Sequence, residues 1–415
     1  MRCGVGESRK QKAARLERET ADLLGLTPIA KPTAPKAGDP AGNRTARQVT
    51  AGEGQRAGDK DLAKLLEVAL RYSEREERYT HGFHSYPAAL HPDAARDLLA
   101  LGEGKVLDPF CGGGTVLVEA MAAGRESLGC DLGAIPCLVA RARITRTDEA
   151  ARTLMRTTAR AAAEAALKAS STLVLPDDAP PEVRRAYEPH VASELLALRT
   201  AIGNDPLLRA VLSAIVVKVS RRSSDTHQVL VDEDRPSGTT ATLFHKKVRE
   251  FARMLETTEA YTTPARVHRE DAREVRLDGF GMVVTSPPYP GVYDYAPIQS
   301  LRRYWLGLDD VSTLHKEIGS RRAFRAGRAE ALVEWRNDTA KWIRASNRAL
   351  APGGRLVIVV GDGQVGGKRI DAWTVHDEAA RALGMRWLSR ASVERWDPGM
   401  ETVRWEHAGV WEKPL

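Results

Sequence analysis

The chain has 415 residues, 42% of them hydrophobic, which suits a globular fold of one large domain or two with a full core. No apolar run reaches the length of a membrane span, and the N-terminal residues carry charges of both signs, unlike a signal peptide. We therefore expect a cytoplasmic protein with no membrane segment. The formal net charge of +7 favours an acidic partner.

The first 60 residues hold twelve Lys and Arg against seven Asp and Glu. Residues 8–24 have the pattern of a helix, but the stretch that follows is too poor in apolar residues to bury anything. We expect residues 1–60 to be a disordered basic tail. Such a tail attracts nucleic acid without sequence preference, or it serves only as a solvated segment that aids solubility.

Strands and helices alternate after this tail. Helices are expected over 60–77 and 92–101, and then in chain order a strand over 105–110, a helix over 114–123, a strand over 127–131 and a helix over 134–144. Alternation of this kind predicts a parallel, doubly wound α/β sheet. Residues 61–147 are assigned to the N-terminal helices and the first half of this sheet domain.

The alternation stops over residues 148–263, which are rich in Ala, Leu, Arg and Glu at helical spacing. We interpret this stretch as an inserted helical subdomain. Residues 264–415 then complete the sheet domain, with strands over 266–269, 282–285 and 355–361, helices around Leu301 and over 329–350, and a final antiparallel hairpin of 386–394 and 407–413. The cysteines Cys3, Cys111, Cys130 and Cys137 have no paired metal spacing, so neither a metal site nor a disulfide is expected.

A glycine-rich turn follows the first strand in VLDPFCGGGT, Val106 to Thr115. Gly112, Gly113 and Gly114 lack the Cβ atoms that would keep a ligand away from the backbone. The helix that starts near Thr115 points free N–H groups toward the same place. The turn therefore predicts a cradle for a cofactor.

A second motif, VVTSPPYPGVYDY, spans Val283 to Tyr295 and ends another apolar strand. Pro287 and Pro288 cannot donate hydrogen bonds, and they fix an extended chain whose carbonyl groups stay free. A free carbonyl beside the Ser286 hydroxyl is suited to accept hydrogen bonds from an amino group. Tyr289 completes the motif.

In this order the motifs resemble those of the DNA amino-methyltransferases, which transfer a methyl group from S-adenosylmethionine to N4 of cytosine or N6 of adenine. The resemblance covers roughly residues 80–145 and 264–413, and rests on DPFCGGGT, GCDLGAIPCLVARA, REDAREV, TSPPY and ALAPGGRLVIVVGDG. It implies a Rossmann-like, seven-stranded class I methyltransferase sheet with an antiparallel last strand. It also implies site-specific DNA methylation of the kind found in restriction–modification systems.

The resemblance assigns roles to individual residues. Asp131 would accept hydrogen bonds from the ribose hydroxyls, Asp271 would face the adenine amino group, and Tyr86 would close over the cofactor carboxylate. The full set of residues expected to bind S-adenosylmethionine is Tyr86, Asp108, Phe110, Gly112, Gly114, Thr115, Asp131 and Asp271. For each of them a purely structural role is the alternative.

The catalytic residues implied are Ser286, Pro287, Pro288 and Tyr289. The Ser286 hydroxyl and the Pro287 carbonyl would accept both amine hydrogens, while Tyr289 would stack on the base. The target base would have to leave the duplex or come from a single strand. Tyr293, Tyr295 and Tyr304 are further candidates to hold the base, with core packing as the alternative.

Basic residues near these motifs are expected to contact the nucleic acid: Arg221, Arg222, Lys246, Lys247, Arg321, Arg322 and Arg325. A solvated face rich in arginine is an equal alternative. In the family that the motifs resemble, a neutral hydroxyl at the first motif position is more frequent in the cytosine-N4 enzymes, although serine occurs in both classes, so Ser286 favours cytosine N4 in DNA as the target. Adenine N6, a base in RNA or transfer RNA, and a degenerate nucleic-acid-binding module without activity are the other readings.

Three further readings are less consistent with the sequence. Pro136-Cys137 resembles the nucleophile of cytosine C5 methyltransferases, but it lies on the cofactor side, far in sequence from the fourth strand. The glycine turn lacks the lysine of a phosphate-binding loop, which argues against an ATPase. Protein glutamine methyltransferases usually begin the Pro-Pro-Tyr motif with asparagine.

Overall fold

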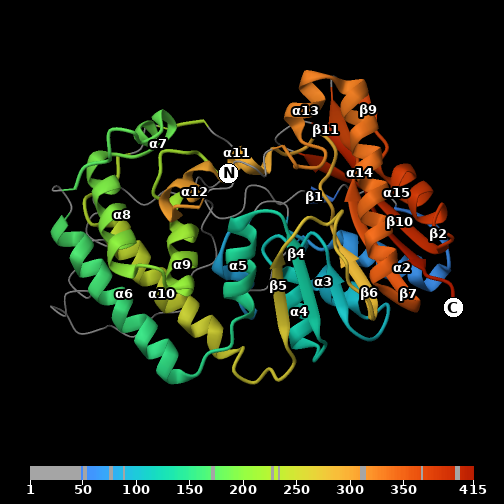
Figure 1. The fold of residues 1–415 in the computed structure, drawn as a ribbon, viewed down its shortest axis with the longest axis horizontal. Helices are drawn as coiled ribbons and strands as arrows, with labels where there is room; N and C mark the ends of the chain where they lie inside the picture. The colour runs from blue at the N-terminus through green and yellow to red at the C-terminus, as the bar shows by residue number, and fades with distance from the viewer. Residues whose placement is uncertain are drawn as a thin grey trace, which may run out of the picture.

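The computed structural model describes residues 48–49, 54–73, 78–86, 89–169, 173–225, 229–231, 234–308, 315–365, 368–397 and 402–415. A sheet domain and a body of helices lie side by side (Figure 1). The helix expected over 8–24 lies outside the described residues. In the part of the chain that is described, none of the helices combines the length and apolar character needed to cross a membrane.

The main sheet is built on seven strands in the order β5-β4-β3-β6-β7-β11-β10. β11 runs antiparallel to both of its neighbours, whereas the strands from β5 to β7 pair in parallel. The predicted Rossmann-like α/β sheet with an antiparallel strand near its end is therefore confirmed. The bounds are β3 (Val106–Asp108), β4 (Ser127–Asp131), β5 (Ala265–Arg269), β6 (Phe280–Thr285), β7 (Leu350–Gly361), β10 (Arg386–Asp397) and β11 (Thr402–Glu412).

Two short strands extend the sheet beyond β10. β1 (Gln48–Val49) and β2 (Gln55–Gly58) both pair antiparallel with β10. The predicted tail of residues 1–60 is corrected at its C-terminal end, because residues 55–58 belong to the sheet. β2 is mostly exposed at the sheet edge, so its residues need not be apolar, and the sequence therefore carries no strand pattern there. A separate hairpin of β8 (Gly363–Val365) and β9 (Lys368–Ile370) follows β7.

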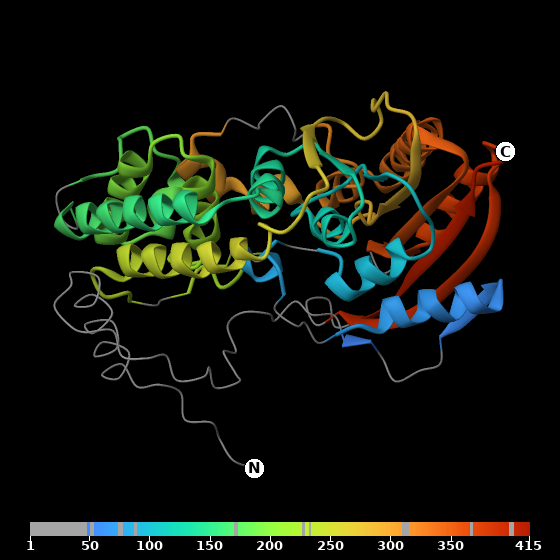
Figure 2. The same cartoon turned by 90° about the horizontal axis from the view of Figure 1, so that it is seen from below.

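Helices cover both faces of the sheet, as alternate residues of β3 show. Val106 packs with α2 (Lys60–Arg71) and α3 (Pro92–Leu99), while Leu107 packs with α14 (Arg328–Ala349) on the opposite face. Both side chains are fully buried. Figure 2 shows α2 lying along β10 and β11. The remaining sheet-domain helices are η1 (His81–Phe83), α4 (Thr115–Ala122), α5 (Ala134–Ile144), α11 (Tyr295–Ile298), α12 (Ser300–Leu306), α13 (Arg321–Ala326) and α15 (Ala372–Arg381).

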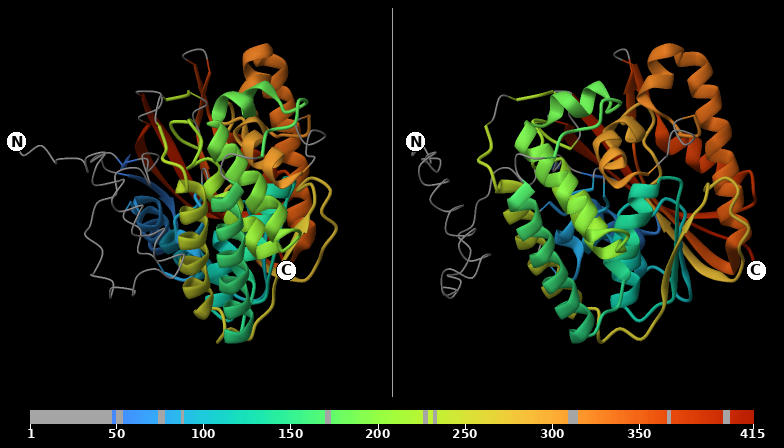
Figure 3. Two further views of the ribbon diagram at one scale, coloured as in Figure 1. Left: turned by 90° about the vertical axis from the view of Figure 1, so that its left-hand side faces the viewer. Right: turned by 60° about the vertical axis from the view of Figure 1, so that its left-hand side comes forward.

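The residues predicted as an insertion form a helical body. It contains α6 (Glu149–Ala169), α7 (Pro181–Ala186), α8 (Pro189–Ile202), α9 (Pro206–Val216) and α10 (Thr239–Glu256), and Figure 3 shows α6 and α10 running alongside each other. Its core includes side chains of the sheet domain, among them Phe83, Ile135 and Trp305, which are fully buried. The insertion is thus joined to the sheet domain by a continuous apolar core.

The parallel strands place four loops at one edge of the sheet. Because β5, β4, β3 and β6 are neighbours, the segments after their carboxyl ends lie next to one another. Ligands in open α/β sheets bind at this edge. Both sequence motifs are in these loops, after β3 and after β6.

Candidate active site

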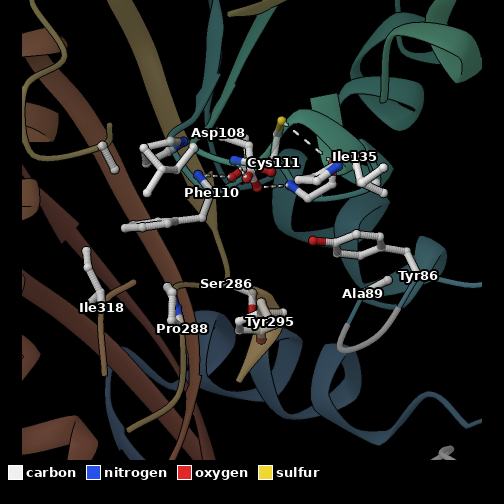
Figure 4. Close-up of a pocket in the computed structure, with 18 of the residues that line it drawn as sticks. Tyr86, Ala89, Asp108, Phe110, Cys111, Ile135, Ser286, Pro288, Tyr295 and Ile318 are labelled. Atoms are coloured by element: carbon white, nitrogen blue, oxygen red, sulfur yellow. Dashed lines mark hydrogen bonds between the residues drawn. The ribbon is translucent and has the colours of Figure 1, made fainter. Parts of the chain in front are cut away.

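A pocket lies at the carboxyl edge of the sheet and contains both motifs. Its lining includes residues from the glycine turn, from the ends of β4 and β5, and from the segment after β6. In Figure 4, Tyr86 and Phe110 lie on opposite sides of the pocket, while Asp108 and Ser286 face each other across it. Of the predicted cofactor residues, the lining contains Tyr86, Asp108, Phe110, Gly112, Thr115, Asp131 and Asp271.

The glycine turn lies so close to neighbouring side chains that a Cβ atom would crowd them. Gly112 has a φ of 49°, and a Cβ atom there would lie 3.2 Å from Cε1 of Tyr86. A Cβ atom at Gly113 would lie 2.9 Å from Nη1 of Arg143. Tyr86 and Arg143 therefore back the turn closely, and the turn can hold this shape only with glycine.

Arg143 is a structural residue of the site that the sequence did not reveal. Its guanidinium group is buried and donates from Nη1 to the Gly113 carbonyl at 2.8 Å. Its Nη2 atom donates to the carbonyls of His84, at 2.7 Å, and His81, at 3.1 Å. Arg143 thus ties the glycine turn to the segment that carries Tyr86. An arginine late in α5 matches no motif, so only the fold brings it here.

Asp131 connects two loops at the pocket. Its Oδ2 accepts a hydrogen bond from the Gly112 backbone N–H at 3.1 Å, and its Oδ1 accepts one from the Gly133 N–H at 2.9 Å. Asp131 also lines the pocket, where a carboxylate can accept hydrogen bonds from a ligand's hydroxyl groups. The position after β4 is therefore suited to a ribose.

Asp108 is the most deeply buried carboxyl group of the lining, with 3% of its surface exposed. Burial raises its pKa from 3.8 to about 7, although Oδ1 accepts hydrogen bonds from Thr285 Oγ1 at 2.7 Å and from the Phe110 N–H at 3.2 Å. The carboxylate of Asp131 raises this pKa further. A cation in the pocket would favour the ionised form.

Asp271 lines the pocket, but its carboxylate already accepts three hydrogen bonds from Arg273. Burial alone would raise its pKa, but Arg273 holds the pKa below its ordinary value. Arg273 donates to Asp271 from its backbone N at 3.0 Å, from Nε at 2.9 Å and from Nη2 at 2.6 Å. The predicted contact with an adenine amino group would have to share these oxygens.

Glu317 lines the pocket too and was missed by the sequence interpretation. Burial raises its pKa, while hydrogen bonds from the Tyr295 N–H and from Arg322 oppose that shift. Glu317 thereby links the segment before α13 to the start of α11. Glu317 lies in the stretch KEIGSRR, which belongs to neither of the two motifs.

The residues of the second motif are only partly in the lining. Ser286 and Pro288 line the pocket, Pro287 is buried beside them, and Tyr289 is 9% exposed and outside the lining. Tyr289 packs against Gly361, where a Cβ atom would lie 2.6 Å from its Cε2, and its hydroxyl donates to Glu406 Oε1 at 2.8 Å. The predicted stacking of Tyr289 on a base thus has no counterpart in this arrangement and stays a prediction.

Tyr295 lies next to Ser286 in the pocket (Figure 4). Its ring is 5.4 Å from that of Tyr293, tilted by 46°. Tyr304 instead packs at the edge of the helical core, 5.3 Å from the Trp305 ring. Of the tyrosines that follow the motif, Tyr295 therefore has the access to hold a ligand.

Gly114, also predicted as a cofactor residue, has a packing role in the structure, and its contact with the cofactor stays a prediction. It has a φ of 83° at the N-terminus of α4 and is outside the pocket lining. A Cβ atom there would lie 3.0 Å from the Cβ of Ala140, so the glycine permits the close approach of α4 and α5.

The predicted basic contacts divide into two groups. Arg222 is buried and donates to the Ile298 carbonyl at 3.2 Å and to Ser300 Oγ at 2.9 Å, while Lys247 is buried and pairs with Glu250 at 3.1 Å. For these two, the expected contact with nucleic acid is corrected, because their charges serve contacts within the protein.

The other basic residues retain some access to solvent. Lys246, Arg322 and Arg325 are exposed, and Arg221 and Arg321 are half-buried. Arg221 lies 3.6 Å from Glu188, Arg321 donates to the Val292 carbonyl, and Arg322 pairs with Glu317 at 3.0 Å.

Comparison with known proteins gives two partial sequence relatives. The chain is 36% identical over 72 residues to the type II methyltransferase M.MvaI of Kocuria varians, and 33% identical over 81 residues to the type II methyltransferase M.MjaII of Methanocaldococcus jannaschii. These segments are 16% and 18% of this chain, and they span only 16% and 15% of the relatives. No family model matches the chain.

Solved structures with a distant likeness include TrmN from Thermus thermophilus and the rRNA methyltransferase aviRa from Streptomyces viridochromogenes. TrmN has a TM-score of 0.32 at 13% identity, covering 79% of this chain and 50% of its own. The corresponding values for aviRa are 0.31, 12%, 80% and 88%.

Proposed function

We propose that the protein transfers a methyl group from S-adenosylmethionine to the exocyclic amine of a nucleobase in DNA, with N4 of cytosine as the expected target. One observation carries this proposal: Asp131 with the glycine turn, and Ser286 with Pro288, line a single pocket. A cofactor cradle and a set of acceptors for an amine are what such a transfer needs in one place.

The pocket fits the proposed cofactor in shape and charge. Gly112 and Gly113 bring backbone without side chains to the pocket lining, and Asp131 brings a carboxylate that can accept hydrogen bonds from ribose hydroxyls. The lining carries the acidic residues Asp108, Asp131, Asp271 and Glu317 against the basic residues Arg303 and Lys316, and this acidic excess suits a ligand with positive charge. S-adenosylmethionine supplies an electrophilic methyl group on a cationic sulfonium.

Ser286 and Pro287 act on the amine in this mechanism. The lone pair of a nucleobase amine is delocalised into the ring, so the nitrogen is a weak nucleophile until its hydrogens are held. The Ser286 hydroxyl and the Pro287 carbonyl accept hydrogen bonds from the amine and direct its lone pair toward the methyl donor. The nitrogen becomes cationic when it gains the methyl group, and it would then lose one proton to solvent. Ser286 Oγ lies 3.5 Å from the Tyr289 hydroxyl, too far for a strong bond, so it is available to a substrate.

DNA is favoured over other amine substrates by two features. Both sequence relatives are named type II methyltransferases, although each is matched over a sixth of its length or less. Exposed cations at Lys246, Arg322 and Arg325 can contact phosphates. Serine in place of aspartate at the first motif position supports cytosine N4.

The test is mass spectrometry of nucleosides. The protein is incubated with isotopically labelled S-adenosylmethionine and with unmethylated DNA or RNA, and both polymers are then digested. Labelled N4-methylcytosine in DNA is expected. Labelled N6-methyladenine alone would change the target base, product only in RNA would change the substrate, and no labelled nucleoside from either polymer would overturn the proposal.

A further inference from the structure

Gln299 is a buried polar residue of the pocket wall with an unused hydrogen-bond donor. It lies between α11 and α12, lines the pocket and is 5% exposed. Its side-chain nitrogen, Nε2, is buried and has no hydrogen-bond partner among the described residues. A buried donor without an acceptor costs about 1–3 kcal/mol, so its position beside a pocket requires an explanation.

The orientation of the Gln299 amide is fixed by Arg302. Nη1 of Arg302 donates to Oε1 of Gln299 at 3.1 Å, and an amide turned the other way would set two donors against each other. The oxygen is therefore committed to Arg302. The amide nitrogen Nε2 does not take part in this contact and remains a hydrogen-bond donor.

Arg302 is itself immobilised by the helical insertion. It is 1% exposed, its Nε donates to the Ser213 carbonyl at 3.0 Å, and its Nη2 pairs with Asp225. A chain of contacts thus runs from Asp225 through Arg302 to Gln299 and ends at the pocket. The insertion holds the Gln299 amide in place although it contributes no residue to the lining.

A nucleobase provides the acceptor that this donor lacks. The ring nitrogen next to the exocyclic amine accepts hydrogen bonds, as N3 does in cytosine and N1 in adenine. Tyr295 lies beside Ser286, and Gln299 follows Tyr295 by one turn at the end of α11. The Gln299 donor is thus tied through α11 to Ser286, which is proposed to hold the amine. A donor at Gln299 and acceptors at Ser286 and Pro287 complement the amine edge of such a base.

We propose that Gln299 reads the target base by donating from Nε2 to a ring acceptor beside the methylated amine. The inference rests on the proposed function, since it requires a nucleobase in the pocket. It assigns the helical insertion a specific task, which is to hold a base-reading amide through Arg302.

The test replaces the donor by an acceptor of the same shape. Gln299→Glu keeps an oxygen for Arg302 and places a second oxygen where Nε2 lies. Its control is Gln55→Glu, the same change on the exposed strand β2. Methylation of unmethylated DNA, S-adenosylmethionine affinity by calorimetry, and melting temperature are measured for both variants and the wild type.

Gln299→Glu is expected to lower kcat/KM for DNA by about 100-fold, because the site then repels the base acceptor. The cofactor dissociation constant should not rise. The melting temperature should stay close to that of the wild type, because the carboxylate pairs with Arg302 and its second oxygen only replaces a donor that was already unpaired. Gln55→Glu should match the wild type throughout. A second variant, Gln299→Met, removes the donor without adding charge and should lower kcat/KM by about 10-fold.

Other results would overturn the inference. Unchanged kcat/KM in Gln299→Glu would show that the base does not contact Nε2. A tenfold weaker cofactor affinity would place the amide in the cofactor site, and a lower melting temperature with a proportional loss of activity would make its role structural. In each of these cases methylation by the wild type would leave the proposed function standing, whereas absence of product from the wild type would remove both.

Discussion

Asp131 accepts a hydrogen bond from the Gly112 N–H, which fixes the glycine turn, and it also lines the pocket. Asp131→Ala should weaken S-adenosylmethionine binding by about 1.5–3 kcal/mol, because hydrogen bonds to a carboxylate are lost. Calorimetry measures this change. Asp178→Ala, at an exposed site in the insertion, is the control. Unchanged affinity in a folded Asp131→Ala protein would remove this residue from the cofactor site.

We expect Asp108 to make cofactor binding depend on pH. Burial raises its pKa to about 7, so at neutral pH the carboxyl group of the free protein is partly protonated. A cationic ligand lowers this pKa, and binding then releases a proton. Affinity should therefore rise between about pH 6 and about pH 8 and level off above. Asp108→Asn should remove this dependence, and an unchanged pH profile in that variant would contradict the assignment.

Tyr289 gives a prediction about stability. Tyr289→Phe removes the donor to Glu406, a residue that is 8% exposed, and should lower the free energy of unfolding by about 1–3 kcal/mol. Denaturant titration measures the loss. If the ring also stacks on the base, the phenylalanine variant keeps activity while Tyr289→Ala loses about 1–3 kcal/mol of transition-state stabilisation. An equal loss of activity in both variants would contradict stacking.

Among the elements, β2 and α2 form a unit that a truncation can test. Asp59 accepts hydrogen bonds from the N–H groups of Asp61 and Leu62 at the start of α2, and Arg56 of β2 pairs with Glu67 of α2. Removal of residues 1–59 should lower the melting temperature, because the loss of the cap alone costs about 1 kcal/mol. Removal of residues 1–47 should leave it unchanged. Equal melting temperatures for both truncations would contradict a structural role for β2.

Elements whose signals are local were predictable from the sequence. β4 and α5 lie at Ser127–Asp131 and Ala134–Ile144, as expected, because a buried strand, a turn and a periodic helix follow within a few residues. β2 was missed because an exposed edge strand needs no apolar pattern. α15 and the β8–β9 hairpin were not anticipated either.

The same division applies to the candidate site. Asp108, Gly112 and Asp131 belong to contiguous motifs, so their proximity follows from the strand order. Gln299 and Glu317 reach the pocket, and Arg143 reaches the glycine turn, only through contacts that are distant in sequence. The burial of Lys247 and Arg222 was not evident either, since a sequence shows a charge without showing which way the side chain points.

For the whole molecule, charge predicts how DNA binding responds to salt. Residues 1–47 carry ten Lys and Arg against five Asp and Glu. Their removal should weaken DNA binding mainly at low salt and reduce the slope of log affinity against log salt concentration, without changing which base is methylated. Fluorescence anisotropy across a salt series measures the slope. An unchanged slope would show that phosphate contacts are made elsewhere.

The shared core of the insertion and α12 couples ligand binding to local unfolding. Leu301 and Trp305 are fully buried in the same cluster as Leu195 and Leu212, while Gln299 and Arg303 on the same segment line the pocket. A ligand that binds only when this wall is folded stabilises the folded form. The free energy of local unfolding of α8 and α9 should then rise by the free energy of ligand binding. Amide protons deep in the insertion, remote from any ligand atom, should therefore exchange with deuterium more slowly once the pocket is filled.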